Sequence, residues 1–208
     1  MLLHLRRSFA LAFLALALTF AYALAGTGIS QLFFKHQADG SLTPYGSTLI
    51  GQNWSQTKCG LNPLGSCVFQ GRPDDLGPYA SGSTNPSEHP GDDPLVANGV
   101  SGSSGATNLG PRSAELVRYT RELVAYWHAR GVDPTPDLVT TSASGYDPDI
   151  SELDAFVQIP MVAKATGLSD AALRHLIEQE TMPAQWGFLG TSYIEVLELN
   201  LALVKLER

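Results

Sequence analysis

The sequence predicts an extracytoplasmic α+β domain behind a single N-terminal transmembrane helix. Three observations support this fold class. Residues 8–34 contain no charged side chain and directly follow Arg6 and Arg7. After Pro111, apolar residues recur three or four positions apart, which is typical of amphipathic helices. Near the C-terminus, apolar and polar residues alternate before a last helical pattern, so strand structure accompanies the helices.

The first apolar segment is long enough to cross a bilayer. Its most apolar part is residues 9–25, and a helix needs about 17–25 residues to span the hydrocarbon core. The two arginines before it favour a cytoplasmic N-terminus. We therefore predict a cytoplasmic stretch at residues 1–7, a transmembrane helix at residues 8–30 and an extracytoplasmic domain at residues 31–208.

The same segment also fits a cleavable signal peptide. A basic start, an apolar centre and the small-residue sequence Ala23-Leu24-Ala25 before Gly26 match the usual cleavage pattern. Apolar residues continue beyond that site as far as Phe34, which favours a retained anchor. Under either interpretation, the rest of the chain lies outside the cytoplasm.

The charge of the remaining 174 residues is acidic. Arg6 and Arg7 are the only charged residues before Lys35, so the rest of the chain carries 11 basic and 20 acidic residues. Nucleic acid is therefore not an expected partner, because phosphate binding needs a basic surface. An ordinary soluble acidic surface explains this charge, and attraction of cations is the alternative.

Residues 56–111 form a long loop rich in Gly, Ser, Pro, Asn and Asp. A loop of this length inside a domain is either an ordered binding surface or partly disordered. It contains both cysteines, Cys59 and Cys67, in the stretch CGLNPLGSC. In an oxidising compartment these residues are candidates for a local disulfide. Two thiolates alone do not complete a tetrahedral metal site, so no metal is predicted there.

The second half of the chain has clear helix signals. Ser113 is a candidate N-cap for a helix that contains Leu116, Tyr119, Leu123 and Trp127 on one face, and Gly131 is a candidate stop. Residues 137–141, DLVTT, then resemble a short strand.

A further group of signals predicts helices between residues 151 and 180. Ser151 and Asp154 form a capping box. Pro160 predicts a kink or break at Ile159–Pro160, and Gly167 ends this region. Ser169 caps another helix, and residues 191–206 predict a strand that runs into a short helix.

Familiar catalytic motifs are absent from the sequence. Asp147, Asp149 and Ser151 begin like a calcium loop, but Glu152 and Gln158 stand where the loop requires glycine and a bidentate acid. The chain contains no phosphate-binding G-x-x-x-x-G-K-[ST] sequence and no paired histidine spacing. No catalytic residue is therefore predicted, although a Ser-His-Asp site need not be visible in a sequence.

An ordered series of short motifs is more specific than any of these patterns. The series is LIGQNW (49–54), QGRP (70–73), TNLGP (107–111), DLVTTSASGYDPDIS (137–151), QIPMVAKATGLS (158–169), GFLG (187–190) and VLELNLAL (196–203). Behind one membrane helix, it resembles the C subunit of the Kdp potassium-transporting P-type ATPase of bacteria and archaea. Three departures are a cysteine-bearing insertion before QGRP, a longer and more irregular loop between Arg72 and Asn108, and Met161, where the family usually has arginine.

The resemblance implies a non-catalytic subunit of a high-affinity, ATP-driven potassium uptake complex. Its implied partners are a channel-like A subunit, a P-type ATPase B subunit, a small F subunit and the lipid bilayer. The implied role is assembly and stability of the complex. The implied location is the bacterial cell (inner) membrane, with one span, a cytoplasmic N-terminus and an outer C-terminal domain.

The resemblance also implies a part in nucleotide binding. The family is described as a catalytic chaperone that raises the ATP affinity of the B subunit, through positions that match Ser142, Ser144, Gly145 and Gln158 here. No recognisable cofactor motif accompanies them, so ATP is expected only through the complex. Two structural alternatives stay open, namely a turn at residues 142–145 and an internally bonded Gln158. An allosteric effect on ATP affinity is a further alternative.

Two other classes of function remain in competition. A secreted binding domain would need a cleaved signal peptide and would be soluble. An extracytoplasmic hydrolase would need a pocket with a nucleophile and a base.

Overall fold

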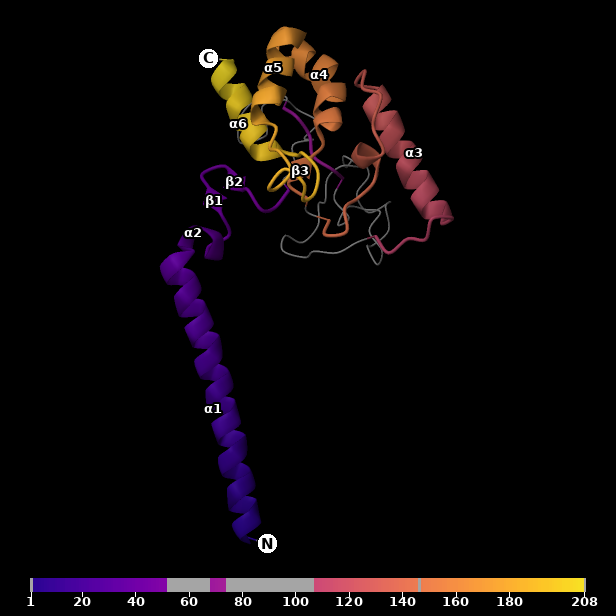
Figure 1. Cartoon of the computed structure of the whole chain (residues 1–208). Helices are drawn as coiled ribbons and strands as arrows, with labels where there is room; N and C mark the ends of the chain where they lie inside the picture. The colour runs from indigo at the N-terminus through magenta and orange to yellow at the C-terminus, as the bar shows by residue number, and fades with distance from the viewer. Residues whose placement is uncertain (1, 52–67, 74–106, 146, 208) are drawn as a thin grey trace. The chain divides into compact units, whose positions relative to one another are not determined.

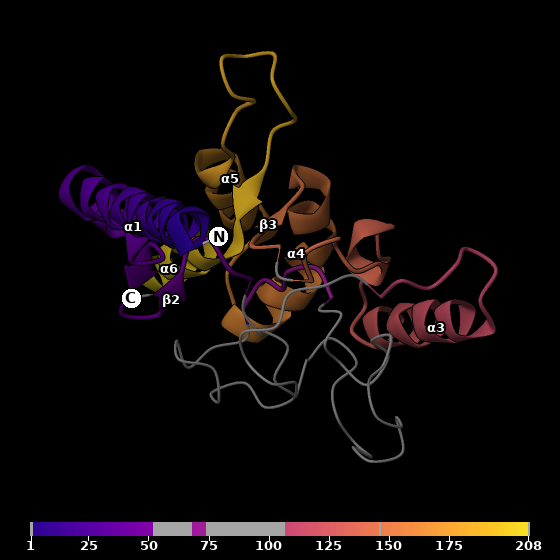
Figure 2. The same cartoon turned by 90° about the horizontal axis from the view of Figure 1, so that it is seen from below.

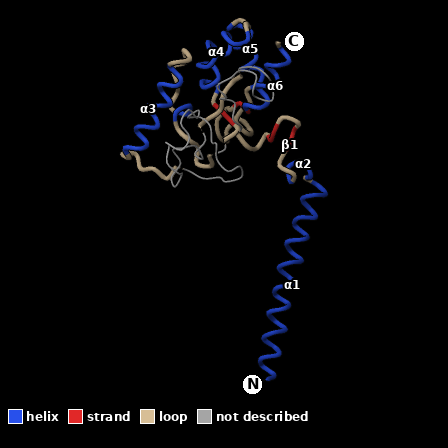
Figure 3. The backbone as a smooth tube through the Cα atoms, turned by 180° about the vertical axis from the view of Figure 1, so that it is seen from behind, coloured by secondary structure: helices blue, strands red, loops and turns tan. Residues whose placement is uncertain are grey.

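The computed structural model describes residues 2–51, 68–73, 107–145 and 147–207. The chain divides into two compact units, Met1–Leu42 and Thr43–Arg208. Figure 1 shows the order of their elements along the chain. Most of the described regular structure is helical, and the strands are short (Figure 3).

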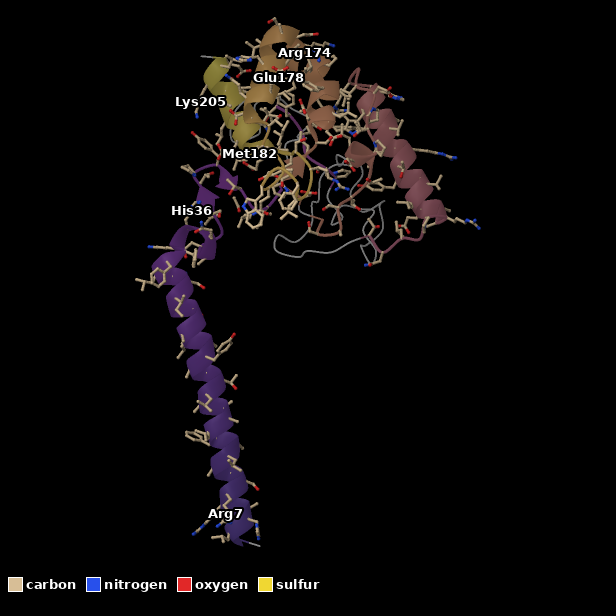
Figure 4. All side chains as sticks on the ribbon, in the orientation of Figure 1. Arg7, His36, Arg174, Glu178, Met182 and Lys205 are labelled. Atoms are coloured by element: carbon tan, nitrogen blue, oxygen red, sulfur yellow. The ribbon has the colours of Figure 1, made fainter. Side chains whose placement is uncertain are left out.

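The first unit consists mainly of one apolar helix. Helix α1, Leu2–Phe33, has 32 residues, so it is about 48 Å long at 1.5 Å per residue. Within Leu3–Phe33, an 18-residue window has a mean hydropathy of 2.1, and none of that window is buried within the structure. The helix is thus long and apolar enough to cross a membrane. It extends beyond the predicted span at both ends, and Arg7 lies near its N-terminal end (Figure 4).

Short elements follow α1. Helix α2 is Lys35–Ala38, and strands β1, Leu42–Thr43, and β2, Gly46–Ser47, pair in a two-stranded sheet. The hydroxyl of Thr43 donates to the carbonyl of Gly46 across the turn at 2.8 Å. This small hairpin precedes the larger part of the second unit.

The described part of the second unit combines four longer helices with a second two-stranded sheet. Its elements are α3 (Ala114–His128), the 3₁₀ helix η2 (Asp137–Val139), β3 (Asp149–Ile150), α4 (Glu152–Thr166), α5 (Asp170–Glu180), β4 (Ile194–Glu195) and α6 (Val196–Leu206). Strands β3 and β4 are antiparallel, with Asp149 opposite Glu195 and Ile150 opposite Ile194. Helix α5 contacts both α4 and α6. The predicted mixture of helix and strand is confirmed.

The predicted helix caps are confirmed. The hydroxyl of Ser113 accepts from the N–H of Leu116, and that of Ser169 accepts from the N–H of Ala172. Ser151 and Asp154 form the reciprocal capping box of α4. Gly167 ends α4 with φ at +76°, a left-handed conformation that glycine adopts without a steric penalty.

Two local predictions are wrong. Residues 137–139 form a 3₁₀ turn instead of a strand, because Pro136 already has helical angles and the hydroxyl of Thr135 accepts from the N–H of Leu138. At Pro160 a kink or a break was predicted, and the break is wrong, because α4 continues to Thr166. Proline removes one helical hydrogen bond, and the burial of Ile159 and Val162 on either side of it offsets that loss.

Two hydrophobic clusters form the core of the second unit. One cluster joins α4, α5, α6, β3 and β4 with Val68 and Phe69. The other joins α3 with the following loop and η2, and centres on the fully buried Trp127. Met161 of α4 packs against both clusters. The apolar side chain at this position therefore contributes to the contact between the two parts of the core.

Candidate functional site

An extended segment without helix or strand structure lies inside the second unit. We call residues 68–73 the inner segment. Val68 and Phe69 are 1% and 0% exposed, and Gln70 is 8% exposed. Backbone groups buried this deeply need hydrogen-bond partners, because an unpaired one loses its bonds to water without replacement. Side chains from the surrounding helices supply these partners.

Gln158 of α4 forms hydrogen bonds with both the N–H and the carbonyl of Gln70. Its Oε1 accepts from the Gln70 N–H at 2.8 Å, and its Nε2 donates to the Gln70 carbonyl at 3.0 Å. The same Nε2 donates to the carbonyl of Asp154 at 3.1 Å. Gln158 is fully buried. The amide thus pairs with Gln70 as a peptide group of a neighbouring strand would.

Asn200 of α6 makes the equivalent pair with the preceding residue. Its Oδ1 accepts from the Phe69 N–H at 2.8 Å, and its Nδ2 donates to the Phe69 carbonyl at 2.9 Å. Asn200 is also fully buried. Two side-chain amides from two helices therefore hold the backbone N–H and carbonyl groups of two consecutive residues of the inner segment.

The side chains of the inner segment connect it to the rest of the unit. The hydroxyl of Tyr126, on α3, donates to Oε1 of Gln70 at 3.0 Å. Arg72 donates to the carbonyls of Thr140 and Thr141 and forms an ion pair with Asp147 at 3.3 Å. The inner segment is thereby tied to α3, α4, α6 and the loop after η2.

That loop contains three of the predicted nucleotide-related residues. Ser142 is 7% exposed, and its Oγ accepts from the N–H of Gly145 at 3.1 Å. The N–H of Gly145 also reaches the carbonyl of Ser142 at 3.2 Å, and the Oγ atoms of Ser142 and Ser144 lie 3.2 Å apart. Gly145 has φ at +71°, which this tight turn requires. The local geometry is that of a closed serine-glycine turn.

The four residues predicted to take part in nucleotide binding therefore lie around the inner segment. Arg72 attaches the loop of Ser142, Ser144 and Gly145 to the inner segment, and Gln158 holds that segment from α4. The polar groups of Gln158 are already bonded to the protein backbone. The assignment of these four residues to nucleotide binding stays a prediction.

One cavity near these residues, lined by described residues, is small. This cavity of about 10 Å³ is lined by Gly71, Asp147 and Glu195, among others. That volume holds about one water molecule, whereas small-molecule sites usually occupy about 300–1,000 Å³. Hollows of about 420 and 350 Å³ lie along α3 and are lined by residues 111–125 only. Among the residues that the structure describes, no cluster of His, Cys, Asp or Glu could hold a metal ion.

Two carboxylates face one another across β3 and β4. Burial, together with the nearby charge of Asp147, raises the pKa of Asp149 to about 6. Burial also raises the pKa of Glu195 to about 7, although the N–H groups of Glu198 and Leu197 oppose this by donating to its carboxylate. Asp149 and Glu195 are directly paired in the strand register. Each one therefore favours protonation more than an exposed carboxylate does.

Sequence reasoning missed two of the residues that organise this site. Asn200 lies at an inward position of the apolar stretch VLELNLALVKL, and Tyr126 lies on the buried face of α3. A polar amide among leucines is the signal that could have identified Asn200, because a buried amide needs partners. The partner itself lies 131 residues earlier, and no local pattern indicates it.

Comparison with known proteins decides the family. The family model described as "KdpC: K+-transporting ATPase, c chain" matches residues 5–205. The chain is 38% identical over 185 residues to a potassium-transporting ATPase KdpC subunit of Rhodopseudomonas palustris, covering 88% of this chain and 87% of that protein. It is 37% identical to the Methylobacterium nodulans KdpC subunit, covering 99% of this chain and 98% of that protein.

The chain belongs to the KdpC family. The resemblance found in its motifs is thus confirmed over nearly the full length. As a KdpC family member, it is an accessory subunit of a potassium-transporting ATPase complex.

The structure shows the surroundings of Met161, which stands where the KdpC motif is expected to have arginine. Met161 packs against both core clusters, so this position is apolar and partly buried in the present chain. The predicted Cys59–Cys67 disulfide and most of the predicted loop at residues 56–111 lie outside the described residues.

Proposed function

We propose that this KdpC family chain is the membrane-anchored, non-catalytic subunit that assembles and stabilises an ATP-driven potassium uptake complex. Helix α1 anchors it in the bacterial cell membrane, residues 1–7 lie in the cytoplasm, and residues 31–208 lie outside. Its partners are a channel-like subunit, a P-type ATPase subunit and a small fourth subunit.

The single observation that carries this proposal is the 32-residue helix of this KdpC family chain, whose apolar part directly follows two arginines near its N-terminal end. An exposed apolar helix of this length is stable in lipid, where its backbone groups are satisfied internally. Arginines at its start favour retention of that end in the cytoplasm.

The effect of the subunit on ATP is proposed to be allosteric. Gln158 and Ser142 are buried and hydrogen-bonded within the second unit, which supports a structural role for both. A subunit that binds one conformation of its complex more tightly changes the affinity of that complex for other ligands. In this way, an outer domain raises the ATP affinity of a cytoplasmic site without touching the nucleotide.

Affinity purification tests the proposal directly. The chain, tagged after Arg208, is recovered from detergent-solubilised membranes, and ATP hydrolysis is measured with and without potassium. We expect a channel-like and a P-type subunit to co-purify, with potassium-stimulated hydrolysis that falls when this chain is omitted. Recovery of a soluble chain that starts at Gly26 would instead establish a secreted domain with a cleaved signal peptide.

A further inference from the structure

An uncharged hairpin projects from the second unit between α5 and β4. We call residues 181–193 the aromatic hairpin, with the sequence TMPAQWGFLGTSY. It contains no Lys, Arg, His, Asp or Glu, although Glu180 and Glu195 stand close to its two ends. Figure 2 shows this loop extending away from the helix and the strand that it connects.

The apolar side chains of the hairpin are exposed. Trp186 is 78% exposed and Phe188 is 73% exposed, whereas Trp127 in the core is 0% exposed. Met182, labelled in Figure 4, and Leu189 add further exposed apolar surface. Large apolar side chains gathered at a projecting tip are typical of an interaction surface.

The backbone of the hairpin satisfies many of its own hydrogen bonds. Met182 and Tyr193 exchange both N–H···O bonds, at 2.8 and 3.0 Å. Gln185 and Leu189 exchange theirs at 3.0 and 2.9 Å, and the N–H of Gly187 donates to the carbonyl of Ala184. Trp186 itself has φ at +55°. Internal backbone pairing of this kind lowers the free-energy cost of contact with lipid, because fewer polar groups lose water without replacement.

The chain also limits how far the second unit can move from the end of α1. Helix α1 ends at Phe33 and the second unit starts at Thr43. Ten residues span at most about 35 Å when fully extended. If α1 crosses a bilayer, Thr43 is therefore tethered within about 35 Å of the end of that helix.

We propose that the aromatic hairpin inserts Trp186 and Phe188 into the interfacial layer of the membrane that holds α1. This inference rests on the membrane anchor in the proposed function. Tryptophan is enriched at the level of lipid headgroups, because its ring is amphipathic. The hairpin has no basic residue and lies between two glutamates. Its ligand is therefore zwitterionic lipid, and anionic headgroups do not strengthen the contact.

Brominated lipids test the contact in the full chain. Trp54→Phe removes one of the three tryptophans, so that emission comes from Trp127 and Trp186 in phosphatidylcholine vesicles. We expect brominated phosphatidylcholine to reduce this emission. The matched variant Trp54→Phe/Trp186→Phe retains only the buried Trp127 and should lose almost no emission. Equal quenching in the two variants would overturn the proposal.

Three controls separate the alternatives. Flotation of the chain with the vesicles shows whether α1 anchors it in the lipid. This control distinguishes a chain that is not anchored from an anchored chain in which lipid does not quench Trp186. Trp186 that is protected from acrylamide but not quenched by brominated lipid would indicate a protein partner and overturn lipid contact. Replacement of part of the phosphatidylcholine by phosphatidylglycerol should not increase quenching. An increase would contradict the zwitterionic assignment.

Discussion

The side chain of Gln158 pairs with the backbone of Gln70, donating to its carbonyl at 3.0 Å and accepting from its N–H at 2.8 Å. The two residues are 88 positions apart in the chain. This pairing, repeated by Asn200 and Phe69, allows a segment without secondary structure to occupy the core. Side-chain amides on α4 and α6 thus provide the inner segment with the backbone hydrogen bonds that a neighbouring strand would otherwise provide.

Gln158→Leu should destabilise the second unit by about 2–5 kcal/mol, because the N–H and carbonyl of Gln70 stay buried without these partners. Urea unfolding of the full chain in detergent, followed by the emission of the buried Trp127, measures the change. The matched control is Gln179→Leu on the exposed surface of α5, which should alter stability by less than about 0.5 kcal/mol. Equal midpoints for the two variants would contradict the structural role of Gln158.

The stability of the second unit should fall as the pH rises through about 6 to 7. The pKa values of Asp149 and Glu195 are higher in the folded chain than their ordinary values of 3.8 and 4.5. The folded state therefore binds more protons than the unfolded state in this range, and the contribution of these groups is present at low pH and lost as they ionise. Unfolding midpoints measured from pH 5 to pH 8 report this loss.

Asp149→Asn should flatten that pH dependence. The amide removes one ionisation and the repulsion between Asp149 and its neighbour Asp147, which contributes to the raised pKa. We expect the variant to be more stable than the parent chain at pH 8, with a smaller difference at pH 5. Asp133→Asn serves as the control, because that side chain is 99% exposed. An unchanged slope in Asp149→Asn would exclude Asp149 as the titrating group.

Arg72→Met should loosen the loop after η2. Arg72 is 22% exposed, and its guanidinium bonds two carbonyls and Asp147. Loss of a charged hydrogen-bond donor at such a place costs about 1–3 kcal/mol. A double-mutant cycle with Asp147→Asn measures the pair alone, and zero coupling energy would show that the ion pair adds nothing. Hydrogen exchange at residues 140–145 should increase in Arg72→Met.

Ser144→Ala tests the proposed allosteric effect on ATP. The Ser144 side chain belongs to an exposed residue of the turn, so the substitution should preserve the fold. In the purified complex we expect the KM for ATP to change by less than about twofold, an effect below 0.5 kcal/mol. Omission of the whole subunit should raise that KM more strongly. A large increase from Ser144→Ala alone would favour direct contact with the nucleotide.

Local signals predicted the helices of the second unit well. Ser113, Ser151, Ser169 and Gly167 act on backbone groups within a few residues, so their effect is readable from the sequence. The break predicted as one alternative at Pro160 does not occur, because tertiary burial of α4 outweighs a local preference. The buried position of the inner segment could not be predicted from the sequence, for a different reason. Its partners come from Gln158 and Asn200, and no short-range pattern encodes such distant pairs.

The pairing of Phe69 with Asn200 also means that Phe69 is synthesised long before its hydrogen-bond partner. The ribosome makes Phe69 131 residues before Asn200, which takes several seconds or more at about 5–20 residues per second. During that interval, the amides that α6 contributes do not yet exist. The domain therefore completes its core only after the last helix leaves the ribosome, and chains that stop before Asn200 are expected to expose Phe69 to chaperones and proteases.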